Sequence, residues 1–360
     1  MKLIGVFGAA LLLVSAGWAD SWESAIKEMK RFEGVSAPGV DTSTLTGKIV
    51  CGYQGWFNTP ADGSFLGWKH YIRGNGHFEP GNCSIDFWPH TAEFSDEALA
   101  HTLWKKKDGT PAKVFTSTHP DVVMKHFEWM KEYGIEAAFL QRFSGPSIRD
   151  PKRFHNNNRI LDNVRKAANA TGRAYVVMYD GGIRNREELD KLKRDWMLLV
   201  DHMGITKDPN DTAYLHHRGK PLVAFWGFGF EHRRAKLELA LEFVEWLKND
   251  PTYGGCSVML GLPTHFRALD YDAVPDPYLH KLIEAADVAS PWAAGRYSMK
   301  DVDVFTEEYW VPDLAWCEEK GVDYLPCVFP GFSWANLTRK PELADQIPRH
   351  GGHFLWKQFA

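Results

Sequence analysis

The sequence predicts an α/β fold in which short buried strands alternate with helices. Apolar runs such as Ile49-Val50-Cys51 lack the every-second-residue alternation of a half-buried strand. A continuous apolar run is typical of a strand that is covered on both faces. Each run is followed by a tip of aromatic, amide or charged residues and then by a helical pattern. This alternation predicts a parallel sheet with right-handed crossovers. In a chain of 360 residues it favours one (β/α)8 TIM-type barrel, a fold that commonly takes about 250 residues or more.

Seven such strands can be counted along the chain. They are expected near residues 49–51, 137–140, 174–178, 221–225, 256–260, 287–290 and 324–329. Helices are expected at 120–133, 156–171, 186–203, 234–249, 278–285, 304–320 and from 348 onward. Because a closed barrel needs eight strands, residues 47–360 are expected to form a barrel that lacks its eighth strand at the C-terminus. An open doubly wound sheet is the competing architecture, but no Gly-rich phosphate loop follows the first strand.

Three segments lie outside this repeat. Residues 20–46 are expected to hold a short helix, at 22–32, and a linker. Residues 58–108 form a long loop rich in Gly, His and aromatic residues, and an insertion of this length is usually functional, such as the wall of a site. Residues 113–117 are expected to add a short extra strand.

Residues 1–19 match a secretory signal peptide. Lys2 precedes an apolar run from Leu3 to Val14, and small residues lie near Ala19. The chain is therefore expected to be exported, to the periplasm or the cell exterior. No membrane span is expected after cleavage, because no other stretch reaches about 18 apolar residues. Five cysteines without CxxC spacing favour buried thiols over a disulfide framework, with a single bridge to Cys83 as the alternative.

Composition and charge limit the class of partner. Lys and Arg number 42 against 46 Asp and Glu, and no basic block suggests nucleic acid or a charged membrane surface. No HExxH motif or other recognised metal spacing is present, so no metal and no cofactor are expected. Aromatic residues make up 14% of the chain, and several of them follow a strand, where sugar rings can stack. The expected partner is an oligo- or polysaccharide, bound by a monomer.

In a barrel, the functional side chains lie at the carboxyl ends of the strands. Asp180 is the carboxylate best placed for catalysis there, although an Asp at a strand end can also cap the Gly-Gly turn that follows it. Arg142 is a candidate for substrate binding, and the alternative is that it forms a structural salt bridge. The substrate-binding candidates come from the strand tips and the long loop, and they are Tyr53, Gln54, Trp56, Asp86, Gln141, Arg142, Tyr179, Trp226, His265, Trp292 and Trp334.

Six short motifs are specific as a set: GYQGWF at 52–57, DFWP at 86–89, FLQRF at 139–143, MYD at 178–180, FWGFG at 225–229 and FPGF at 329–332. Together they resemble bacterial proteins grouped with glycoside hydrolase families 71 and 99, over a region from about Thr46 to the end. Family 99 holds endo-acting, retaining α-mannan hydrolases on a (β/α)8 barrel, and family 71 holds α-1,3-glucan hydrolases. The resemblance implies that Asp180 is an acidic residue of the pocket floor. It also implies that the main catalytic acids follow the last strand, beyond Ala360.

The leading hypothesis is therefore an exported glycoside hydrolase-like protein that acts on an α-linked glycan, of mannan or glucan type, with retention of configuration. Because the expected catalytic acids lie beyond the chain, a non-catalytic glycan-binding or degenerate barrel is the alternative. A third hypothesis is a barrel hydrolase that acts on something other than a sugar.

Overall fold

The computed structural model describes residues 21–145 and 148–360. The predicted signal peptide, residues 1–19, lies outside the described residues, so export stays a prediction. Within the described part of the chain, no helix has the length and apolar character of a membrane span.

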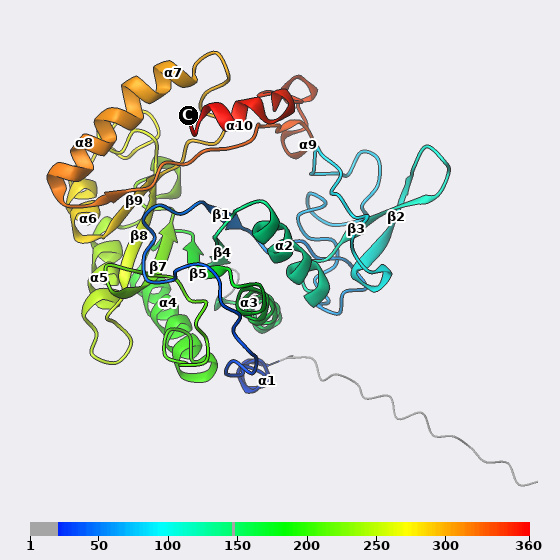
Figure 1. Ribbon diagram of the computed structural model, residues 1–360, viewed down its shortest axis with the longest axis horizontal. Coiled ribbons are helices and arrows are strands. Elements are labelled where there is room, and N and C mark those ends of the chain that lie inside the picture. The colour runs from blue at the N-terminus through cyan, green and yellow to red at the C-terminus, as the bar shows by residue number, and fades with distance from the viewer. Residues whose placement is uncertain (1–20, 146–147) are drawn as a thin grey trace, which may run out of the picture.

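The central feature is a parallel sheet of seven strands that forms a half-barrel (Figure 1). Neighbouring strands in the sheet are also consecutive among these seven, as the crossover rule predicts. In order they are β1 (Val50–Tyr53), β4 (Ala137–Phe143), β5 (Ala174–Asp180), β7 (Lys220–Trp226), β8 (Ser257–Leu262), β9 (Val288–Pro291) and β10 (Asp323–Tyr324), and the short β6 (His216–His217) pairs antiparallel with β7. The predicted α/β class and the count of seven strands are confirmed.

The last strand is shorter than the predicted 324–329. Leu325 still donates its N–H to Ala289 O of β9 at 2.9 Å, but Pro326 has no N–H to continue the ladder. Among the described residues, β10 pairs only with β9, and β1 pairs only with β4. The first strand therefore has one edge without a strand partner, as the seven-strand count predicts.

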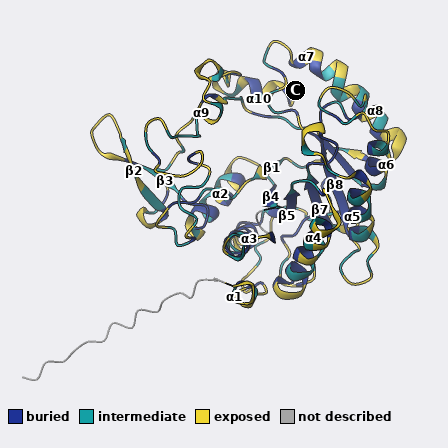
Figure 2. Ribbon diagram, turned by 180° about the vertical axis from the view of Figure 1, so that it is seen from behind, coloured by how far each residue is buried: buried dark blue, intermediate teal, exposed yellow. Residues whose placement is uncertain are grey.

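Helices cover the outer side of the sheet and turn their exposed faces to solvent (Figure 2). The helices up to residue 320 are α1 (Trp22–Lys27), α2 (Pro120–Glu132), α3 (Pro151–Thr171), α4 (Arg186–Leu198), α5 (Leu237–Asn249), α6 (Tyr278–Ala285), α7 (Val302–Phe305) and α8 (Val311–Lys320). Two predicted helices contain π-helical turns, η3 (Leu199–Met203) after α4 and η5 (Thr306–Trp310) between α7 and α8. The predicted helix 22–32 is wrong beyond Lys27, and α3 begins five residues before the predicted start, where the Asp150 carboxylate accepts the N–H of Lys152 at 2.9 Å.

Two apolar layers lie on opposite faces of the strands. Along β5, Val176 and Met178 face the inside of the half-barrel, whereas Val177 and Tyr179 pack against the helices. The inner layer is continued on the other strands by Phe139, Ala224, Met259 and Val288. Because side chains alternate along a strand, this assignment fixes which face every strand-end residue occupies.

The long loop after β1 folds into a small unit with a hydrophobic core of its own. It holds η1 (Asp96–Ala98) and the antiparallel pair β2 (Leu99–Lys105) and β3 (Pro111–Phe115) around a core of Tyr71, Phe78 and Val114. The predicted extra strand corresponds to β3, two residues earlier, while its partner β2 was not predicted. The C-terminal region adds α9 (Ala335–Thr338), η6 (Pro341–Leu343), η7 (His350–Gly352) and α10 (His353–Lys357), so the predicted last helix is present but short.

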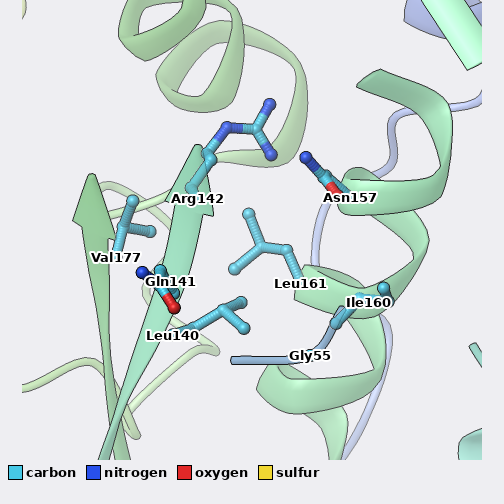
Figure 3. A pocket seen from close by; sticks show the side chains of 8 residues that line it. All are labelled: Gly55, Leu140, Gln141, Arg142, Asn157, Ile160, Leu161 and Val177. Carbon is cyan, nitrogen blue, oxygen red and sulfur yellow. The ribbon is translucent and has the colours of Figure 1, made fainter. Parts of the chain in front are cut away.

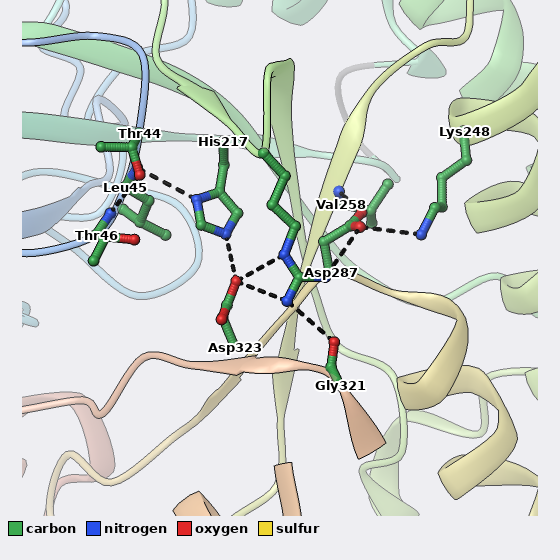
Figure 4. A network of polar contacts seen from close by, with 10 residues as sticks. Thr44, Leu45, Thr46, His217, Lys248, Val258, Asp287, Gly321 and Asp323 are labelled. Carbon is green, nitrogen blue, oxygen red and sulfur yellow. Dashed lines mark hydrogen bonds and ion pairs between the residues drawn. The ribbon is translucent and has the colours of Figure 1, made fainter. Parts of the chain in front are cut away.

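At the amino end of the strands, a polar network joins three separate segments (Figure 4). His217 Nε2 lies 2.7 Å from Asp323 Oδ2 at the start of β10, and its Nδ1 accepts the N–H of Leu45 at 3.4 Å. Arg218 donates to the same Asp323 oxygen at 2.9 Å. These contacts tie β6, β10 and the segment before β1 together, away from the carboxyl ends of the strands.

Candidate functional site

The carboxyl ends of the strands bring a polar and aromatic set of side chains to the inner face. Gln141 and Asp180 follow the inward-facing Phe139 and Met178 by two residues, and Trp226 follows Ala224 in the same way. In the sheet register, Asp180 is paired with Trp226, and Trp226 with Gly261. Residues from three sequence motifs therefore meet on one surface, as parallel strands require.

Asp180 is the centre of this set. Arg233 Nη1 lies 2.5 Å from Asp180 Oδ1, and Gln141 Nε2 donates to the other carboxylate oxygen. Only 13% of the Asp180 side chain is exposed, so the charge is mostly withdrawn from water and is matched by the guanidinium. Asp180 is the one acidic residue that ends a strand in residues 21–145 and 148–360.

A cavity of about 380 Å³ opens beside this ion pair. Its wall includes Asp180, Arg233, Gly181, Phe143, Arg149 and Glu188. Glu188 is held by Arg149 at 2.6 Å and by Arg184 at 2.5 Å. Burial raises the pKa of Glu188, but hydrogen bonds from Arg184 outweigh it and leave the pKa below its ordinary value. The cavity wall thus carries charges of both signs, which suits a ligand with many hydroxyl groups.

Two glycines make room for this surface. A Cβ on Gly261 would lie 1.9 Å from Cδ2 of Trp226, so the indole ring covers the glycine of the neighbouring strand. Gly227 has a φ of +122°, and a Cβ there would lie 1.7 Å from Gly181 O. The Trp226 ring can therefore lie across β8 only because the strand has no side chain at that position.

Aromatic rings extend the surface beyond the carboxylate. Trp292 follows β9, is 41% exposed, and meets Trp226 edge to face with 5.5 Å between ring centroids. Trp56 follows β1 and stacks with Phe143 at 5.5 Å and with His70 at 4.1 Å. Gln54, also after β1, is exposed. The exposed Trp292 ring offers a flat apolar face next to polar groups, whereas the Trp56 ring already stacks on protein rings.

Gly55, between these residues, closes a second, very small cavity of about 10 Å³ against α3 (Figure 3). Its φ is +59°, and a Cβ there would lie 2.9 Å from Ile160. This space holds at most about one water molecule, so it serves the packing of β4 on α3.

His265 lies beyond β8, next to its own acidic and aromatic neighbours. Its Nδ1 is 2.8 Å from Asp270 Oδ1, and its ring lies about 5 Å from those of Tyr271 and Tyr309. Asp272 accepts the backbone N–H of His265 at 3.0 Å, and Arg296 contacts the other oxygen at 2.5 Å. His265 is therefore not among the residues that line the cavity beside Asp180.

Three predicted site residues face the helices instead of the half-barrel interior. Arg142 donates twice to Asp195, at 2.7 Å each, and Tyr179 donates to the same carboxylate at 2.8 Å. Burial lowers the pKa of Arg142, but the Asp195 charge outweighs it and raises the pKa overall. Tyr53 shares a 2.8 Å hydrogen bond with His126 of α2. Arg142 therefore makes the structural salt bridge that was its alternative interpretation.

Asp86 and Trp334 belong to another part of the molecule. Asp86 accepts hydrogen bonds from Ser333 Oγ at 2.6 Å and from the N–H groups of Ala335 and Asn336 at 2.8 Å, so it caps α9. Trp334 is exposed and its ring lies 5.9 Å from Phe332. Neither residue lines the Asp180 cavity.

Sequence reasoning missed Arg233, the partner of Asp180. It lies in η4 (Glu231–Arg233), just after the β7 tip motif. A signal was present, because a half-buried carboxylate at a strand end requires a cation, and Arg233 is the first cation after that tip. In the described part of the chain, no group of three His, Cys, Asp or Glu residues could hold a metal ion.

The parallel half-barrel with this strand-end site defines an α/β, TIM-like protein. No protein-family model matches the chain, and no curated protein matches it in sequence. Among solved structures, it is similar to the GH99 endo-alpha-mannosidase from Bacteroides thetaiotaomicron, with a TM-score of 0.58, 14% identity, and coverage of 88% of this chain and 80% of that chain. The same enzyme in complex with BIS-TRIS-propane gives a TM-score of 0.55, 14% identity, and coverage of 88% and 79%. The likeness is one of fold.

Proposed function

We propose that the protein is an exported glycoside hydrolase-like protein that acts on an α-linked glycan, of mannan or glucan type, with retention of configuration. The observation that carries the proposal is the inward-facing Asp180, which is held by Gln141 and Arg233 and paired in the sheet register with Trp226, whose ring meets that of Trp292. A carboxylate and a guanidinium recognise adjacent sugar hydroxyls, and an indole face packs on the apolar face of a sugar ring. The GH99 neighbours, named as endo-alpha-mannosidases, supply the expected glycan class.

In this proposal Asp180 accepts hydrogen bonds from the sugar, and Arg233 and Gln141 fix the orientation of its carboxylate. Hydrolysis of a glycosidic bond usually needs two carboxyl groups on opposite sides of that bond. The proposal takes the retaining hydrolysis itself from the sequence resemblance, and the protein is expected to release sugar with retained configuration.

A second candidate function is glycan binding without hydrolysis. It is favoured by the pairing of Asp180 itself, because a carboxylate already bound to Arg233 and Gln141 has little freedom to act as a nucleophile or proton donor.

Calorimetric titration with α-linked mannotetraose and α-1,3-linked glucotetraose tests both functions, together with a product assay by NMR. Asp180→Asn is the informative variant, and Asp190→Asn on the exposed side of α4 is its matched control. Binding that Asp180→Asn weakens and Asp190→Asn does not supports the site, and release of sugar with retained configuration supports the hydrolase. Binding without release of sugar favours the second function, and no binding of either sugar contradicts both.

Export has a separate test. Expression of the full chain with its first 19 residues, followed by N-terminal sequencing of the mature protein, is expected to give a start at Asp20 outside the cytoplasm. An unprocessed protein retained in the cytoplasm would contradict export.

A further inference from the structure

A second cavity, larger than the one beside Asp180, lies away from it, between the long loop and the α9 region. Its volume is about 580 Å³, within the range of about 300–1,000 Å³ that is usual for small-ligand sites. It is lined by Arg73, Asn82, Phe87 and Trp104 on one side and by Asn336, Arg339 and Asp345 on the other. None of these residues lines the Asp180 cavity.

The two walls of this cavity are fixed to each other by Asp86. Its carboxylate accepts three hydrogen bonds from Ser333, Ala335 and Asn336, and Asn336 Nδ2 donates to Ile85 O at 2.7 Å. The segments that meet here are about 250 residues apart in sequence. A cavity held in this way is preformed, so a ligand would bind without the entropic cost of ordering its walls.

Two cationic groups on the lining have no protein partner. In residues 21–145 and 148–360, the guanidinium groups of Arg73 and Arg339 form no ion pair or side-chain hydrogen bond. Asn82 and Asn336 both donate their amide N–H groups to backbone carbonyls, at 3.0 and 2.7 Å, which leaves their side-chain oxygens as acceptors. The lining therefore offers donors and acceptors together.

Two lining residues also have a backbone conformation that glycine adopts more easily. Arg339, at the C-cap of α9, has a φ of +59°, and Asp345 has a φ of +47°. Side chains other than glycine are disfavoured there, and such strain is concentrated at functional sites. Both positions nevertheless carry charged side chains that line the cavity.

We propose that this cavity is a second saccharide-binding site, for a neutral oligosaccharide, separate from the Asp180 site. Asp86 and Asp345 balance Arg73 and Arg339, so the lining has no net formal charge and does not select an anion. Alternating donors and acceptors suit sugar hydroxyls, which donate and accept, and Phe87 and Trp104 suit the apolar faces of the rings. The inference rests on the proposed function for its ligand class, but uses none of the Asp180 site residues.

The test is a calorimetric titration of the full chain with α-linked mannotetraose and α-1,3-linked glucotetraose. We expect two binding events, one of which Trp292→Ala removes. Arg339→Gly and Arg73→Gln should each weaken the other event by at least about tenfold. Arg234→Gly is the matched control, because Arg234 is also exposed with a φ of +51° but lines neither cavity. Since glycine relaxes the backbone at both positions, neither variant is expected to lower the melting temperature.

The outcomes separate the two proposals. A single event lost in Arg339→Gly but retained in Trp292→Ala supports the second site and contradicts glycan binding at Asp180. A single event lost only in Trp292→Ala does the reverse. Wild-type affinity in both Arg339→Gly and Arg73→Gln overturns the second site, as does an equal loss in Arg234→Gly. Binding of a glucuronate-containing tetrasaccharide in place of the neutral ones would overturn the neutral ligand class.

Discussion

Arg233 holds Asp180 across a distance of 53 residues in sequence, with 2.5 Å between Nη1 and Oδ1. The carboxylate comes from the end of β5, and the guanidinium from the short η4 turn after β7. We predict that Arg233→Gln weakens glycan binding at least about tenfold, because the carboxylate loses a charge-assisted partner. Titration of Arg233→Gln, Asp180→Asn and the double variant checks this. If the pair acts as a unit, the double variant loses little more than either single variant.

Asp195→Asn should destabilise the protein without changing the site. It removes the charge that two Arg142 hydrogen bonds and Tyr179 share in a buried position, and breaking such a pair costs about 3–5 kcal/mol. Urea denaturation measures the loss. Asp190→Asn, in the same helix but exposed, is the control and should change the free energy of unfolding by less than about 0.5 kcal/mol. Since Arg142 and Tyr179 face the helices, the glycan affinity of folded Asp195→Asn should equal that of the wild type.

Gly261→Ala should disturb the Trp226 ring. The added methyl group would lie 1.9 Å from the indole, so the ring must move, and such overpacking costs about 1–3 kcal/mol. Both the free energy of unfolding and the glycan affinity are expected to fall. Gly52→Ala in β1 is the comparison, because the nearest atom to its added methyl group is a flexible Gln54 nitrogen at 3.9 Å. Equal effects of the two substitutions would show that the indole contact is unimportant.

The buried carboxyl group of Asp313 should make the stability of the protein depend on pH. Burial raises its pKa from the ordinary value of 3.8 to about 6, although Arg267 donates to Oδ1 at 2.9 Å. Because the folded protein holds this proton more tightly than the unfolded chain, the stabilising contribution is complete below pH 3.8 and is lost as the pH rises to about 6. The difference between a pKa of 3.8 and one of about 6 corresponds to about 3 kcal/mol. Asp313→Asn should remove this decline, measured by urea denaturation at pH 4, 5, 6 and 7, and an unchanged decline would contradict the assignment.

The fold was largely predictable because each strand carries its own local signal. Apolar runs before tips such as Tyr179-Asp180 identify strands buried on both faces, and seven were found in sequence and in structure. The exact ends were less predictable. Pro326 shortens β10, and the π-helical turns after Leu198 and Phe305 lie inside stretches whose pattern predicts a continuous helix.

The site was predictable only by its location. Sequence identifies the strand tips, but at a tip the inward and outward positions are adjacent, and local composition does not distinguish them. Asp180 and Gln141 turned inward, whereas Arg142 and Tyr179 turned toward Asp195. The cap that Asp86 forms on α9 depends on two segments about 250 residues apart, so it required the folded chain.

The alternation along β5 also limits how this protein can evolve. Tyr179 and Asp180 are neighbours that serve opposite faces of one strand. Insertion or deletion of a single residue upstream in β5 would exchange them, moving a phenol into the cavity and a second carboxylate against Asp195. The strand can therefore accept a conservative substitution more readily than a change in its length.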